Sequence, residues 1–158
     1  MISRLLDFLS GREAPVVARS PDELAHAVAA LLIEAARMDE NFDVSERATV
    51  GRLLAQRFDL DAQAVSALVE EAERAVRRST QYFPFTRQIN DRLSEVERVQ
   101  IIEMMWKVAY SDGVLDPHED MLLRRIAGLI HVTDRDRGLA RQRALEDLAA
   151  DSELTKAT

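Results

Sequence analysis

Apolar residues recur at helical spacing along almost the whole chain, and strand-like alternation is nearly absent. Residues 24–38 and 96–110 are apolar almost all round, which predicts two central, buried helices. The segments that follow each of them carry one apolar stripe and one polar face, as expected of helices that cover a core. Glycine and proline, five and four residues respectively, rarely interrupt these patterns. The sequence therefore predicts an all-α, single-domain bundle of about seven or eight helices.

Capping patterns predict where several helices begin. Residues 20–23 (Ser-Pro-Asp-Glu) and 94–97 (Ser-Glu-Val-Glu) have the spacing of a capping box, in which serine caps the helix and glutamate bonds back. Asp61 and Thr133 are further expected N-caps. We expect helices over about 1–10, 20–38, 43–57, 61–78, 82–89, 94–110, 116–130 and 133–150. The single domain 1–158 then has its core at 20–150, an N-terminal segment at 1–19 and a frayed tail at 151–158.

An acidic sequence, Asp-x-x-x-Asp-x-x-Glu, follows each of the two apolar segments. The copies are 73 residues apart, and the same offset aligns the apolar residues on either side of them. The matched acids are Asp39, Asp43 and Glu46 in the first copy and Asp112, Asp116 and Glu119 in the second. Such self-similarity predicts a duplicated helix–acidic loop–helix unit and a bundle with pseudo-twofold character.

The acids have two interpretations. In one, the second aspartate of each copy is an N-cap and the glutamate completes its capping box. The first aspartate, Asp39 or Asp112, fits less well, because a carboxylate at the end of a helix opposes the helix dipole. In the other, all six acids bind a divalent cation, calcium or magnesium, which prefers several oxygen ligands. The spacing is not that of an EF-hand, and two loops would have to converge. Both interpretations stay open.

Composition narrows the class of protein. Lys and Arg total 21 against 28 Asp and Glu, a net charge of −7 that disfavours nucleic acid as a partner. No cysteine is present, and no nucleophile, phosphate-binding or dinucleotide motif occurs, so we expect a non-enzymatic protein. Charge-free runs are too short to span a bilayer, and residues 1–10 do not resemble a secretory signal, which predicts a cytoplasmic protein. Arginines near residue 140 alternate with aspartates and are expected to form a solvated face: Arg135, Arg137, Arg141 and Arg143.

The N-terminal segment is the expected contact element. Ile2, Leu5, Leu6 and Leu9 share one face of a short amphipathic helix. We expect this face to dock on the bundle; contact with a partner or with a membrane surface is the alternative, and one short helix is a weak anchor. The expected partner is another protein, with membrane association at most indirect. The oligomeric state is open.

The second acidic sequence also carries a family resemblance. Its matching residues are Ala109, Asp112, Gly113 and Glu119, with a degenerate first copy at Ala36, Asp39 and Glu46 in which Glu40 replaces the glycine. Residues 24–130 resemble the TerB-like family, named for a tellurite-resistance protein, in a bacterial branch with an aromatic-rich insert. The resemblance implies an all-α bundle, acids that bind divalent metal and a role in stress or tellurite resistance. The expected function is a cation-binding module; the alternative is a metal-free interaction adaptor that uses the N-terminal helix or a bundle groove.

Overall fold

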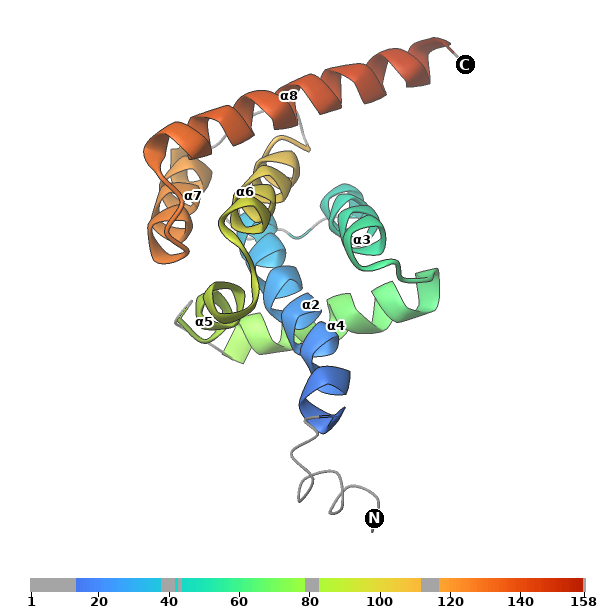
Figure 1. Ribbon diagram of the computed structural model, residues 1–158. Coiled ribbons are helices and arrows are strands. Elements are labelled where there is room, and N and C mark those ends of the chain that lie inside the picture. Colours follow the sequence, from blue (N-terminus) through green and yellow to red (C-terminus); the bar gives the residue numbers. More distant parts are fainter. Residues whose placement is uncertain (1–13, 38–41, 43, 79–82, 112–116, 158) are drawn as a thin grey trace.

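The computed structural model describes residues 14–37, 42, 44–78, 83–111 and 117–157, the side chains of 14–22, 83 and 157 excepted. These residues form seven helices and no strand (Figure 1). They are α2 (Ala14–Ala36), α3 (Val44–Phe58), α4 (Ala62–Arg78), α5 (Phe83–Arg92), α6 (Glu95–Ala109), α7 (Pro117–Leu129) and α8 (Asp134–Ala157). The predicted all-α fold is confirmed.

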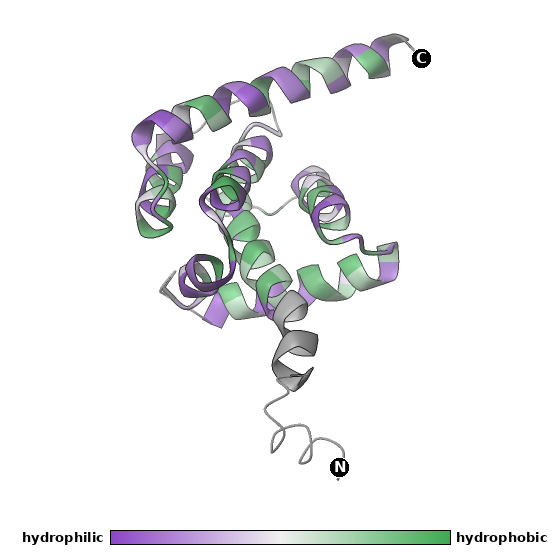
Figure 2. Cartoon of the chain, viewed as in Figure 1, coloured by the Kyte–Doolittle hydropathy of each residue, from purple (hydrophilic) through white to green (hydrophobic). Residues whose placement is uncertain are grey.

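The two apolar helices, α2 and α6, lie at the centre. α2 packs against α3, α4, α5, α6 and α7, and α6 also packs against α3, α7 and α8. Every residue from Ala27 to Ile33 is buried, as are Met104, Met105 and Trp106 in α6. Figure 2 shows hydrophobic residues concentrated along α2 and on the inner sides of its neighbours. Removing this apolar surface from water stabilises the bundle by about 25 cal/mol per Å².

Three of the predicted N-caps are confirmed. Ser94 Oγ accepts a hydrogen bond from the Glu97 backbone N–H (3.2 Å), and Glu97 Oε1 accepts one from the Ser94 N–H (3.1 Å). Asp61 Oδ1 accepts from Ala64 N–H at 2.8 Å, and Thr133 Oγ1 accepts from Asp136 N–H at 3.1 Å. Each bond satisfies a backbone donor that has no partner inside its helix.

Two predicted helix ends are wrong. α2 begins at Ala14 rather than Ser20, because proline is tolerated in the first turn of a helix and Pro15 falls there. Glu23 is consequently inside the helix, where its carboxylate pairs with Arg92 at 3.2 Å. The predicted frayed tail is helical as far as Ala157, since no glycine or proline follows Gly138 to stop α8. The expected helix 1–10 lies outside the described residues.

The arginines of α8 do not form a purely solvated face. Arg141 Nε donates to the Tyr110 hydroxyl at 2.7 Å, and its guanidinium lies 5.4 Å from the Trp106 ring centroid. Arg143 Nε pairs with Glu103 at 3.1 Å. These contacts hold α8 against α6, because the long stems of arginine span the distance between the two helices. Arg135 is exposed, as predicted.

Two connectors repeat the same geometry. Asp59, after α3, and His131, after α7, are the described non-glycine residues with positive φ, at 52° and 60°. The residue after each donates its N–H to a carbonyl five positions back: Leu60 to Ala55 (3.1 Å) and Val132 to Ala127 (2.8 Å). This is the Schellman type of helix end. The duplication stays a prediction, and these matched helix ends support it.

Candidate cation site at the starts of α3 and α7

One acid of each predicted set lies in the described part of the chain. Glu46 is the third residue of α3, and Glu119 is the third residue of α7. The other predicted ligands, Asp39, Asp43, Asp112 and Asp116, lie outside the described residues. The structure therefore places the helix end of each acidic sequence and leaves the convergence of the two loops as a prediction.

Both glutamates are buried, at 6% and 7% exposure for Glu46 and Glu119. Each lies on the inner stripe of its helix, and the rest of the stripe matches at the same 73-residue offset. In α3 the stripe continues with Val50, Leu53 and Leu54; in α7 it continues with Leu123, Ile126 and Ala127. Both side chains take part in interactions within the protein. A carboxylate in the first turn is also favoured by the helix dipole.

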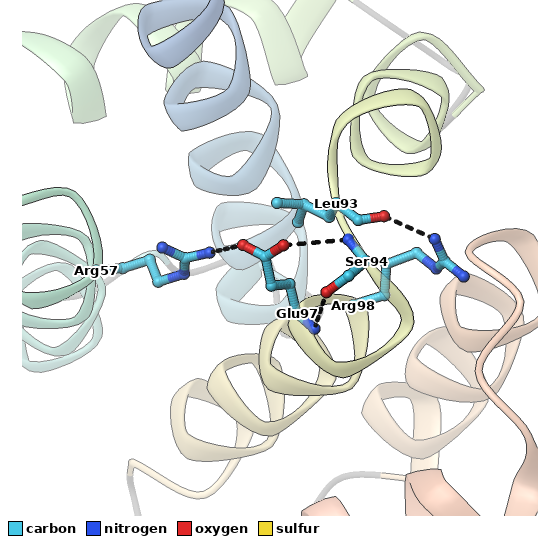
Figure 3. A network of polar contacts seen from close by, with 5 residues as sticks. All are labelled: Arg57, Leu93, Ser94, Glu97 and Arg98. Atoms are coloured by element: carbon cyan, nitrogen blue, oxygen red, sulfur yellow. Dashed lines mark hydrogen bonds and ion pairs between the residues drawn. The ribbon is translucent and has the colours of Figure 1, made fainter.

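The capping box of α6 provides an internal comparison. Glu97 occupies the same third position of its helix and makes both capping-box hydrogen bonds, yet its side chain is 40% exposed. It also accepts a hydrogen bond from Arg57 of α3 at 2.9 Å, as Figure 3 shows. A glutamate can therefore complete a capping box without burial. The burial of Glu46 and Glu119 needs a reason other than capping.

Environment shifts the pKa of two carboxyl groups in opposite directions. The Ser94 backbone N–H, with smaller contributions from the Ser94 hydroxyl and Arg57, lowers the pKa of Glu97. Burial raises the pKa of Glu34, against an opposing effect of Arg37. Glu34 is in the last turn of α2, directly before the first acidic sequence. It was not among the predicted ligands, although it is the sole acid in the apolar run 24–36.

The described residues alone do not make a metal site. Among them, no three His, Asp or Glu side chains are grouped so that they could hold a metal ion. Calcium and magnesium require about six oxygen ligands or more, some of them from water. A complete site would therefore need the four loop aspartates together with Glu46 and Glu119.

A groove of about 680 Å³ lies between α2, α4 and α5. His26 faces it, with its ring centroid 6.4 Å from that of Phe85. The sequence indicated that a bundle groove could bind a partner, but it did not indicate which helices would form one. The residues come from three helices far apart in the chain, so no local pattern identifies them.

The family described as tellurite resistance protein TerB matches residues 25–142. The chain belongs to the TerB family. Comparisons with curated proteins and with solved structures find no match. The TerB match includes both acidic sequences, all of α3 to α7 and the first part of α8. Within the described residues, no helix of this TerB protein is long and apolar enough to cross a membrane.

Proposed function

We propose that this TerB-family protein is a non-catalytic module that binds a divalent cation, calcium or magnesium, between its two acidic loops. The ligands are Asp39, Asp43 and Glu46 from one loop and Asp112, Asp116 and Glu119 from the other. The protein acts in the cytoplasm, in stress or tellurite resistance, through contact with another protein. The burial of Glu46 and Glu119 at equivalent positions is the observation that carries the proposal.

The physical argument is the cost of burying charge. A carboxylate removed from water is retained where hydrogen bonds, an opposite charge or a metal compensates for the lost hydration. The first-turn N–H groups supply part of this compensation. A cation held by the preceding aspartates would supply more, and it would also offset the repulsion among three carboxylates within eight residues. The exposed Glu97 has no such group of acids before it.

Calorimetric titration of the full-length chain with calcium and with magnesium tests the proposal. We expect measurable heat with the wild type and none with the double variant Asp39→Asn, Asp112→Asn. The matched control is Asp61→Asn, because Asp61 is a helix-capping aspartate outside the acidic loops. Metal at about 100 times Kd should raise the free energy of unfolding by about 2.7 kcal/mol, or the melting temperature by about 5–10 °C.

Two results would exclude the proposal: no heat and no thermal shift with the wild type, or an equal loss of heat in Asp61→Asn and in the double variant. Either would favour the second candidate, a metal-free adaptor. The groove between α2, α4 and α5 is the observation in favour of that candidate. An adaptor should keep its stability and its interactions when Asp39 and Asp112 become asparagine.

A further inference from the structure

The groove between α2, α4 and α5 has a mostly apolar lining that is open to solvent. Its main apolar residues are Leu60, Ala64, Ala67, Leu68, Pro84 and Phe85. Ala64, Ala67 and Pro84 are exposed, and Leu60 and Leu68 are half-buried. Glu23 and Glu71 lie at its rim and are both exposed. A concave apolar surface with a few polar groups around it is typical of a binding site.

The geometry points to one occupant, the amphipathic N-terminal segment (residues 1–10) of the same chain. The groove includes residues 23–27 of α2, whereas α2 begins at Ala14. The intervening turns span about 15 Å at 1.5 Å per residue, and a ten-residue helix is also about 15 Å long. One reversal of the chain would therefore bring the segment back beside the groove. Gly11 is suited to such a reversal because glycine adopts left-handed backbone conformations readily.

The chemistry of the segment matches that of the groove. Its apolar face would cover the exposed alanines and leucines, while Arg4 and Arg12 would face the acidic rim. A second groove, of about 390 Å³ between α3 and α4, includes no residue of α2 and is bordered by Arg47 and Arg52. Covalent attachment gives the segment an effective concentration in the millimolar range, so an external helix would have to displace it. The segment is thus a self-cover for the groove, independent of cation binding.

Disulfide trapping in the full-length chain tests this placement cleanly, because the sequence has no cysteine. The test variant combines Leu5→Cys with Ala67→Cys, and the control combines Leu5→Cys with Ser66→Cys. Ala67 and Ser66 are adjacent and both exposed on α4, but Ala67 lines the first groove and Ser66 the second. In dilute protein with a glutathione buffer, the intramolecular disulfide should form at least about tenfold faster in the test variant.

Equal rates in the two variants would overturn the inference, and disulfide-linked dimers alone would assign the groove to a second copy. A measurement without cysteines guards against altered folding. In the variant Leu5→Asp, Leu6→Asp, backbone amides of residues 64–71 should exchange with solvent severalfold faster than in the wild type. Unchanged exchange there would also overturn the inference.

Discussion

The units α2–α3–α4 and α6–α7–α8 share a packing scheme but differ in their polar contacts. In each unit the central helix packs on the two that follow, and those two pack on each other. In the first unit Glu73 of α4 pairs with Arg47 of α3 at 2.6 Å. In the second, α8 is tied instead to the central helix, through Lys107 and Asp147 at 2.9 Å and through Arg143 and Glu103.

What the units have in common is apolar and local, and what differs is on the surface. The buried positions of α3 and α7 match, and so do the helix ends at Asp59 and His131. Surface ion pairs contribute little stability, typically about 0–1 kcal/mol, so they can differ without loss of the fold. The two buried glutamates are an exception, since they are charged residues that match in both units.

The largest expected effect tests whether the units share one core. Leu32 in α2 and Met105 in α6 are both fully buried, and they match at the 73-residue offset. Replacing either with alanine should lower the free energy of unfolding by about 2–5 kcal/mol, because a cavity remains. Leu154→Ala, at a site 68% exposed, is the control and should change it by less than about 0.5 kcal/mol. Chemical denaturation should give one transition for every variant; two transitions would contradict a shared core.

The matched helix ends should respond to glycine in a graded way. A left-handed residue other than glycine costs about 1–2 kcal/mol, and less for aspartate than for most residues. His131→Gly should therefore raise the free energy of unfolding by about 1 kcal/mol, and Asp59→Gly by less. Gly138→Ala is the control for backbone entropy: an added Cβ meets nothing within 4 Å, and alanine should stabilise α8 by about 0.5–1 kcal/mol. Destabilisation by His131→Gly would show that the imidazole contributes contacts that outweigh backbone strain.

The pKa shifts of Glu97 and Glu34 predict opposite dependences of stability on pH. A lowered pKa in the folded state means that Glu97 stabilises the protein above its ordinary value of 4.5 and that this stability is lost as the pH falls through the lowered pKa. Glu97→Gln should cost less than about 1 kcal/mol at pH 7, because the carboxylate is partly solvated, and the difference should shrink in acid.

The raised pKa of Glu34 gives the reverse sign. Its contribution is present below 4.5 and is lost as the pH rises through the raised pKa. Glu34→Gln should therefore be at least as stable as the wild type at pH 7, and the two proteins should converge in acid. Thermal melts between pH 3 and 7, a range of about four units around the ordinary value, would check both variants. Parallel profiles for the two variants would contradict the assigned shifts.

The sequence predicted local features well and tertiary ones poorly. The cap at Ser94 was predictable because its donor and acceptor lie within four residues. A similar pattern at Ser20 misled, because it does not show whether the residues before it are also helical. The contact between Arg141 and Tyr110 depends on the path of α8 across α6, which no local pattern encodes. The acidic sequences were evident from the repeat, but the burial of their glutamates required the structure.

The most direct test of cation binding by both units is calcium titration of the single variants Glu46→Gln and Glu119→Gln, with Glu97→Gln as the control. Glutamine preserves the shape of the side chain and removes its charge. If the two units form one site, either variant of a buried glutamate should weaken calcium binding at least about tenfold, whereas Glu97→Gln should bind like the wild type. Unchanged binding in both variants, or an equal loss in Glu97→Gln, would contradict the account.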